Sequence, residues 1–202
     1  MELTPKNEKP NLDMEEPEKS NCTPWLERSS FRIVLMSMFT ALAVVLGYLL
    51  VYLPNIELFT LMIFLSGFIL GKKDGAIVGL MSSFIFAFFN PYGVSPLPLF
   101  AYQLAHYSLV GILGGITHSF LHKKEYFKPE EDLYIFRIML IFAIIGGCIT
   151  FIYDIISTLI GALLFYGTLE AFWIAYIFGL AFTTVHLIGN TLGFILRSYK
   201  GY

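Results

Sequence analysis

The stretch IVLMSMFTALAVVLGYLLVYL, residues 33–53, decides the class of this protein because it contains no charged residue. A helix needs about 20 mostly apolar residues to cross a bilayer, and this stretch is long enough. The composition of the whole chain indicates the same class, since 56% of the 202 residues are hydrophobic and 14% are charged. Soluble domains contain about 25% charged residues. The sequence therefore predicts an integral membrane protein.

More apolar stretches follow the first one. They cover residues 58–70, 75–89, 98–121, 134–165 and 171–196. Together with residues 33–53 they predict an all-α, polytopic membrane protein, a bundle of about six transmembrane helices. The stretches 58–70 and 75–89 are short for a full span, so we expect them to tilt or to extend into the flanking loops. Gly71-Lys72-Lys73-Asp74-Gly75 between them predicts a tight basic turn.

Residues 1–29 differ in composition from the rest of the chain. They are polar and rich in Glu, Lys, Pro and Asn, so they cannot bury a core and are expected to form a disordered cytoplasmic tail. Residues 30–202 then form the transmembrane domain. The net charge of −2 gives no reason to expect a nucleic-acid partner.

The distribution of charge predicts the orientation in the membrane. If the helices alternate and the N-terminus is cytoplasmic, all 13 Lys and Arg residues fall in cytoplasmic segments or at their membrane boundary. The loops on the other side contain Glu57 and Glu170 and no basic residue. This is the pattern of the positive-inside rule. It predicts a multi-pass protein of the cell membrane with both termini in the cytoplasm.

Few polar residues interrupt the apolar stretches, and Asp154 is the strongest candidate for a functional one. It is the one acid inside any of these stretches, at about 16 Å from the outer end of its helix by the helical rise. An ionisable group at that depth is costly, so it indicates a functional site or a specific partner. The two interpretations are a contact with a ligand and a structural hydrogen bond to Tyr, Thr or His on a neighbouring helix.

Two further pairs of polar residues share a helix face. Gln103 and His106 are three residues apart in the outer half of 98–121, and His186 and Asn190 are four apart in 171–196. His186 is interpreted first as a helix–helix contact. His106, Asp154 and His186 are metal-ligand types, but no close spacing supports a metal site, and none is predicted.

The expected outer loops contribute Asn55, Glu57, Asn90 and Tyr92, with Trp173 at the start of the last helix. Tyr and Trp at this depth are commonly interfacial anchors. An aromatic pocket for a flat ligand is the alternative for Trp173.

Small residues recur at helical spacing. Gly67, Gly71, Gly75 and Gly79 are four apart, as are Gly111 and Gly115, and the first helix has the pairs Ala43–Gly47 and Ser37–Ala41. Such pairs allow helix backbones to approach closely in lipid. They predict packing within the chain, and in the first helix they also allow a docking face for a partner subunit.

Motifs of common enzymes are missing. The chain has no P-loop, no Gly-x-Ser-x-Gly and no His-Glu-x-x-His, so neither enzymatic activity nor a cofactor is predicted. A membrane-bound enzyme or enzyme subunit, for example in isoprenoid metabolism, remains an alternative, but it would need an acidic pair or metal cluster. A structural membrane protein without a ligand is another, and Asp154, Gln103 and His106 weigh against it.

The chain also contains the short motifs MFTALA at 38–43, PNIE at 54–57, GFILGKKDG at 67–75, NPYG at 90–93, GILGG at 111–115, Tyr153-Asp154 and HLIGN at 186–190. In this order they resemble one family, the substrate-binding S components of energy-coupling factor (ECF) transporters. The resemblance covers about residues 30–198. It implies a small six-helix protein that captures a vitamin or similar micronutrient from outside, together with a transmembrane coupling subunit and two cytoplasmic ATPase subunits.

The resemblance also implies where the sites lie. Substrate would bind toward the outer side, among helices 4 to 6 and the loops after helices 1, 3 and 5. The candidate residues there are Asn55, Glu57, Asn90, Tyr92, Gln103, His106, Asp154 and Trp173. Helices 1 to 3 would face the coupling subunit. An Ala-x-x-x-Ala pattern expected in the first helix is met as Ala43-x-x-x-Gly47, and these two residues are the candidates for docking.

The orientation can be tested by cysteine labelling with a membrane-impermeant reagent. Cysteines placed at Asn90 or Gly167 should react from outside the cell, because both lie in loops without basic residues. Cysteines at Lys73 or Lys124 should react only after the membrane is opened. Labelling of position 73 or 124 in intact cells, without labelling of position 90, would contradict the orientation.

Overall fold

The computed structural model describes residues 29–50, 58–90, 93–123 and 136–197. This part of the chain is helical and contains no strand. Its helices are α1 Ser29–Leu49, α2 Phe59–Leu70, α3 Lys72–Phe88, α4 Leu97–Leu121, α5 Phe136–Tyr166 and α6 Leu169–Arg197. The predicted all-α architecture is confirmed, and each helix lies close to its predicted stretch. The prediction of a disordered tail concerns residues that lie outside the described ranges, except Ser29, which begins α1.

The predicted five-residue turn between α2 and α3 is wrong in its extent. Gly71 alone separates the two helices, with φ of 96°, a backbone conformation that glycine adopts without steric penalty. Lys72, Lys73 and Asp74 already belong to α3. Asp74 in the first turn complements the positive end of the helix dipole. A single glycine is therefore enough to reverse the chain, and the charged residues need not leave the helix.

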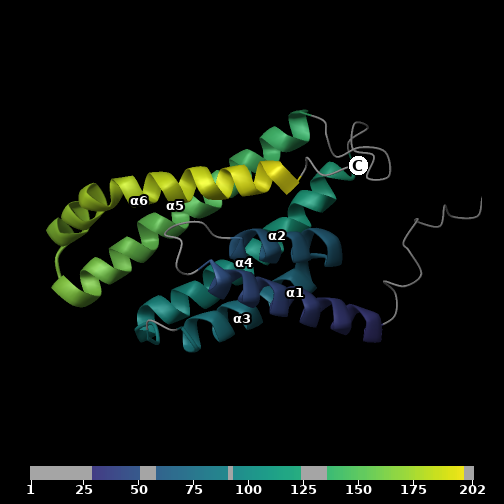
Figure 1. Ribbon diagram of the computed structural model, residues 1–202, viewed down its shortest axis with the longest axis horizontal. Helices are drawn as coiled ribbons and strands as arrows, with labels where there is room; N and C mark the ends of the chain where they lie inside the picture. Colours follow the sequence, from purple (N-terminus) through teal and green to yellow (C-terminus); the bar gives the residue numbers. More distant parts are fainter. Residues whose placement is uncertain (1–28, 51–57, 91–92, 124–135, 198–202) are drawn as a thin grey trace, which may run out of the picture.

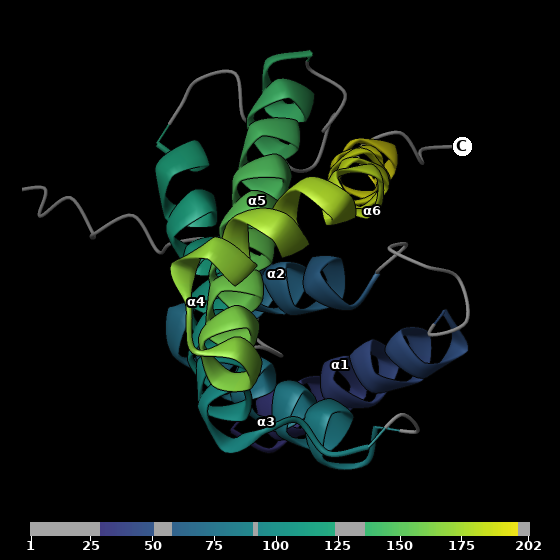
Figure 2. The same ribbon diagram turned by 90° about the vertical axis from the view of Figure 1, so that its left-hand side faces the viewer.

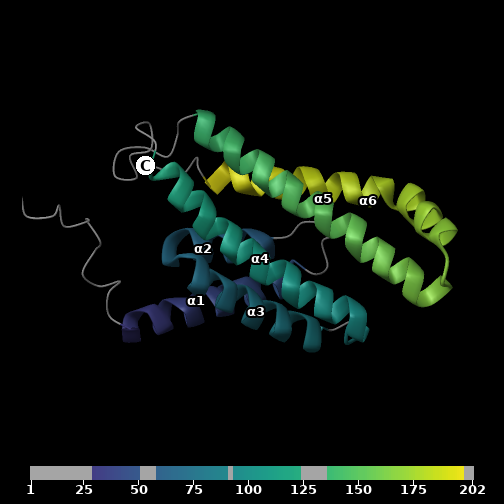
Figure 3. The same ribbon diagram turned by 180° about the vertical axis from the view of Figure 1, so that it is seen from behind.

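The helices form two groups. In the first group α1 packs against α2 and α3, and α4 packs against the same two helices. In the second group α5 and α6 pack along each other, and they touch the first group mainly where α5 meets α4 and α6 meets α2. Figures 1 and 2 show α5 and α6 above α1, α2 and α3. Seen from behind in Figure 3, α4 lies between α3 and α5.

The first group is held together where glycines bring α2, α3 and α4 into backbone contact. A Cβ added at Gly67 or Gly75 would overlap the backbone of Gly111, and one at Gly111 would overlap the carbonyl group of Gly75. Gly79 faces the backbone of Tyr107 in the same way. The prediction that these glycines serve packing within the chain is confirmed.

The outer surface of several helices is apolar enough for a lipid environment. By length and composition, four candidate spans are found in the described residues: Ser29–Leu49, Leu97–Leu121, Leu140–Tyr166 and Leu169–Ile195. On α6, Trp173, Phe178 and Phe182 are 61%, 81% and 61% exposed. Large exposed apolar surfaces are uncommon on soluble monomers, whereas lipid tails cover them in a bilayer. The helices α2 and α3 are not among these spans, so the count of six remains a prediction.

An ion pair joins the beginnings of α1 and α3. The Nε and Nη2 atoms of Arg32 donate hydrogen bonds of 2.8 and 2.6 Å to Oδ2 of Asp74. The Asp74 side chain is 9% exposed and that of Arg32 is 43% exposed. A buried carboxylate needs such a partner, so this pair fixes α1 beside α3 at one end of the bundle.

The glycine contact can be tested by adding one methyl group. Gly111→Ala should destabilise the protein by about 1–3 kcal/mol or more, because backbone rather than a flexible side chain occupies the space. Gly179→Ala in α6 is the matched control, since no atom lies within 4 Å of its added Cβ. The measurement is the unfolding midpoint of both variants in one detergent. Equal midpoints for the two variants would contradict the assignment.

Candidate binding site at helices α4, α5 and α6

Three polar side chains of α4 face α5. The amide Nε2 of Gln103 donates a hydrogen bond of 3.1 Å to the hydroxyl of Tyr153. The hydroxyl of Tyr102 lies 3.3 Å from Nδ1 of His106 and 3.4 Å from the carbonyl oxygen of Ile152. Tyr102 and Gln103 both neighbour His106 on the surface of α4, because they precede it by four and three residues. This surface and α5 form a polar seam in an otherwise apolar bundle.

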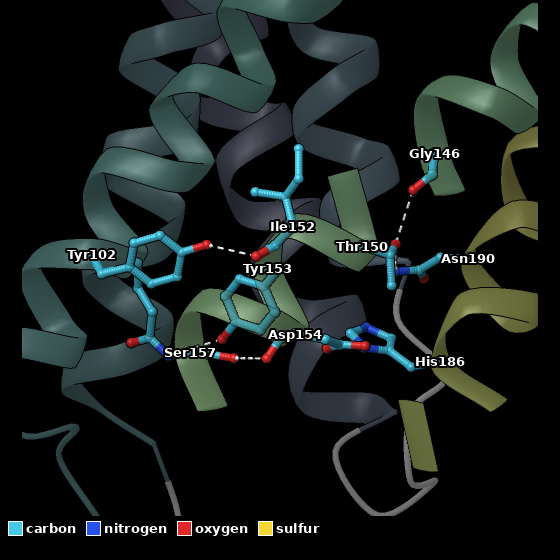
Figure 4. Close-up of polar contacts among 10 residues, drawn as sticks. Tyr102, Gly146, Thr150, Ile152, Tyr153, Asp154, Ser157, His186 and Asn190 are labelled. Atoms are coloured by element: carbon cyan, nitrogen blue, oxygen red, sulfur yellow. Dashed lines mark hydrogen bonds and ion pairs between the residues drawn. The ribbon is translucent and has the colours of Figure 1, made fainter. Parts of the chain in front are cut away.

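Aromatic rings fill the same seam around Tyr153. Its ring centroid lies 5.1 Å from that of His106, 5.7 Å from Tyr107 and 6.0 Å from Tyr102. The Tyr102 and Tyr153 rings are close to parallel, with an interplanar angle of 23°. Figure 4 shows Tyr153 between Tyr102 on one side and the Asp154–His186 pair on the other. Electron-rich ring faces therefore lie beside the carboxylate.

Asp154 is held by the neighbouring helix. Its Oδ1 atom is 2.8 Å from Nδ1 of His186, and the two side chains are 12% and 7% exposed. With the carboxylate ionised, Nδ1 of His186 donates the hydrogen bond. The structural hydrogen bond to a neighbouring His, one of the two interpretations of Asp154, is thus present.

A second hydrogen bond joins the same two helices. The amide Nδ2 of Asn190 donates to Oγ1 of Thr150 at 3.0 Å, and that hydroxyl donates to the carbonyl oxygen of Gly146. Thr150 and Asp154 are one turn apart on α5, as His186 and Asn190 are on α6, so two polar contacts stack between the helices (Figure 4). The interpretation of His186 as a helix–helix contact is confirmed, and Asn190 makes a second contact between the same helices.

Several buried oxygen atoms in this region can accept hydrogen bonds that they do not receive. Within the described ranges, Oε1 of Gln103, Oδ2 of Asp154 and Oδ1 of Asn190 are inaccessible to solvent and receive no hydrogen bond. A buried polar atom without a partner costs about 1–3 kcal/mol, so such atoms need an explanation. All three are oxygen atoms, so each can accept a hydrogen bond from a donor that enters the bundle.

A comparison with protein families identifies the family of this chain. Residues 31–196 match the family described as ECF transporter, substrate-specific component. The chain belongs to this family. No curated protein and no solved structure matches it.

The resemblance seen in the short motifs is thereby confirmed for almost the whole described chain. As a substrate-specific component, the protein is a multi-pass protein of the cell membrane and a substrate-binding subunit of an ECF transporter. The family is one of transporter components, and it is not an enzyme family.

The structure brings some of the predicted substrate-binding residues of this S component together. Gln103, His106 and Asp154 meet around Tyr153. Asn90 lies in the connection before α4, where its carbonyl oxygen accepts a hydrogen bond from Gly93. The remaining predictions in the loops, Asn55, Glu57 and Tyr92, lie outside the described residues.

Trp173 lies outside the seam of this S component. It is 61% exposed near the start of α6 and contacts the ring of Phe172. That position favours the interpretation of an interfacial anchor over that of a pocket wall. For metals, no group of three or more His, Cys, Asp or Glu residues that could hold an ion is found in the described ranges.

The sequence pattern assigned no binding or contact role to four residues at the site, which are Tyr102, Tyr107, Tyr153 and Thr150. Tyrosine in an apolar stretch was counted as apolar or as an anchor. The available signal was spacing, because Tyr102 precedes His106 by four residues and Thr150 precedes Asp154 by four. Polar groups that repeat every turn on one face indicate a polar contact inside the bundle.

The predicted docking residues of the S component are turned inward. Ala43 is fully buried, and a Cβ at Gly47 would lie 2.9 Å from Phe86 and 3.2 Å from Phe59. Their positions do not fit a direct contact with a partner, because α2 and α3 already cover that face of α1. The close approach that these small residues allow is made within the chain.

The other small pair of α1 lies on an open, apolar groove between α1 and α3. The groove has a volume of about 490 Å³. It is lined by Ile33, Met36, Ser37, Thr40 and Ala41 of α1 and by Ile77, Met81 and Ile85 of α3. Ser37 and Ala41 therefore offer a small-residue surface to the outside of the bundle.

Proposed function

We propose that this S component captures a small, vitamin-like micronutrient from outside the cell and presents it to partner subunits for ATP-driven uptake. The observation that supports this most is the polar seam of α4, α5 and α6, with Gln103, Tyr153 and Asp154 inside an apolar bundle. Buried polar groups in a membrane segment indicate a substrate path or site. Membership of the family supports the same role.

The proposed topology has six spans and both termini in the cytoplasm. Support comes from the basic residues, since Lys72 and Lys73 begin α3 and Lys123 follows α4. These helix ends then lie at the cytoplasmic side by the positive-inside rule. Asp154 is 12 residues from Tyr166 at the other end of α5, or about 18 Å along the helix axis, near the middle of the bilayer.

Partner subunits would supply the energy. The sequence has no P-loop, and the family implies association with a transmembrane coupling subunit and ATPase subunits. We place the coupling subunit on the groove between α1 and α3. Small residues at Ser37 and Ala41 would let a partner helix approach closely, which is how helices associate in lipid.

The substrate role of Asp154 can be tested with Asp154→Asn, which keeps the shape and removes the charge. If the carboxylate accepts a charge-assisted hydrogen bond from the substrate, the loss should be about 1.5–3 kcal/mol. That corresponds to a roughly 10- to 150-fold rise in Kd for the molecule retained by the purified wild-type protein. Native mass spectrometry identifies that molecule, and calorimetry measures its Kd.

Stability must be measured on the same sample, because Asp154 also bonds to His186. Thr150→Val is the matched control, since it removes the other α5–α6 hydrogen bond without touching a charge. We expect this control to lose some stability, about 0.6 kcal/mol for such a bond in a membrane protein, and to keep its affinity. Unchanged affinity with lower stability in Asp154→Asn would limit the carboxylate to a structural role.

The docking surface can be tested with Ala41→Trp, which fills the groove between α1 and α3. We expect the variant to lose most of its association with the coupling subunit while it retains substrate, because the groove lies on α1 and α3 and the seam on α4, α5 and α6. Ala175→Trp, on the exposed surface of α6, is the control and should associate normally. Pull-down of the complex from membranes measures the effect. Equal recovery of partners by both variants would exclude this groove as the docking site.

A further inference from the structure

The chemistry of the seam restricts the class of substrate, provided that the proposed function is right. We infer that the substrate is a flat organic cation, such as a protonated nitrogen heterocycle or an aromatic ammonium compound, and that it has no carboxylate or phosphate group. Three features of the seam lead to this inference: a carboxylate with a spare oxygen, ring faces beside it, and helices without Lys or Arg.

The carboxylate is the first feature. Oδ1 of Asp154 is bonded to His186, whereas Oδ2 is buried and receives no hydrogen bond among the described residues. An ionised carboxylate is an acceptor with two oxygens. Gln103, whose Nε2 bonds to the hydroxyl of Tyr153, provides a second acceptor. Its Oε1 atom is also buried and receives no hydrogen bond among the described residues. A ligand with N–H donors, one of them charged, would satisfy both.

The aromatic rings are the second feature. Tyr102 and Tyr153 are nearly parallel, and His106 and Tyr107 lie against Tyr153. The face of an aromatic ring is electronegative, so it attracts cations and stacks with flat rings. Tyr102 belongs to α4 and Tyr153 to α5, and α5 packs mainly on α6. A shift of α5 and α6 away from α4 would therefore open a slot between flat ring faces next to Asp154.

The distribution of charge is the third feature. Helix α4, helix α5 from Ile138 onward and helix α6 up to Leu196 contain no Lys or Arg. Their acids are Asp154 and Glu170. A carboxylate or phosphate on the substrate would be buried near Asp154 without a Lys or Arg side chain from these helices, and Nδ1 of His186 is already bonded to Asp154. Both desolvation and like-charge repulsion oppose this arrangement. The seam thus favours cations and disfavours anions.

The first test identifies the charge of the natural substrate. The full-length protein is purified from its own membranes, the retained small molecule is released by denaturation, and the molecule is passed over cation- and anion-exchange resins at pH 7. We expect retention on the cation exchanger and ultraviolet absorption by an aromatic ring. A retained molecule that is neutral or anionic overturns the inferred class and leaves the proposed function standing.

The second test uses simple probes and does not depend on a retained molecule. Benzylammonium, benzyl alcohol and benzoate share one ring and differ in charge, and the cation also carries the N–H donors that the two acceptor oxygens require. Only the cation should raise the thermal unfolding temperature of the detergent-purified protein. Binding of benzoate as strong as that of the cation, or no binding of the cation, overturns the class.

Matched variants connect the probe to the seam. Asp154→Asn should weaken binding of benzylammonium at least tenfold, whereas Glu170→Gln, which removes one negative charge from the exposed start of α6, should change it less than twofold. Equal effects of the two variants would assign the binding to net charge and overturn the site. If purified protein retains no molecule and no fraction of a host extract stabilises it, the proposed function fails. The probe series then still decides whether the seam binds cations.

Discussion

The backbone contact of α2, α3 and α4 is the constraint on which the rest of the structure depends. Side chains normally hold helix axes apart, and here glycines remove them at the crossing, so that Gly67, Gly75 and Gly111 meet backbone to backbone. In lipid, where apolar burial gives little preference for protein over solvent, such close packing is the main source of helix association. It fixes the path of α4 and, through α4, the place of Tyr102, Gln103 and His106.

The two halves of the bundle are held together by different kinds of contact. The half made of α1 to α4 is joined by glycines, by the aromatic cluster of Phe59, Phe86 and Tyr107 and by the Arg32–Asp74 ion pair. The half made of α5 and α6 is joined by polar contacts stacked one turn apart. The seam between the halves is where polar groups of α4 and α5 meet, and a site at a boundary between two units can open without unpacking either of them.

The fold was predictable from the sequence to the extent that hydrophobicity determines it. Continuous apolar runs predict the helices to within a few residues, but GKKDG at 71–75 resembles a loop by composition, and its lysines in fact belong to α3. Gly71 makes the reversal alone, and long Lys side chains can extend to water from a helix end. Small residues also have two possible uses. Ala41 and Ala43 lie on the same helix, and only the packing reveals that Ala43 faces inward while Ala41 lines the groove.

The polar residues of the candidate site could be predicted from the sequence, because they interrupt the apolar segments. Gln103, His106 and Asp154 stand out because polar residues are rare in such segments. The tyrosines do not stand out, since their rings suit lipid and core equally well, and their hydroxyl groups matter only once a partner such as Gln103 is in reach. Which helices are neighbours, and therefore which polar residues meet, depends on the glycine crossing and on no local pattern.

The surroundings of α2 have a consequence for the biogenesis of the protein. With 12 residues it is about 18 Å long, well short of the roughly 30 Å hydrocarbon core, and its residues from Phe59 to Gly67 are all buried by neighbouring helices. A helix this short does not match the thickness of the bilayer when it leaves the translocon alone. Since α4 provides much of the surroundings of α2 and is synthesised later, α2 reaches its final environment only after α4 has emerged. The final placement of this segment is thus a tertiary folding event that follows the synthesis of α4.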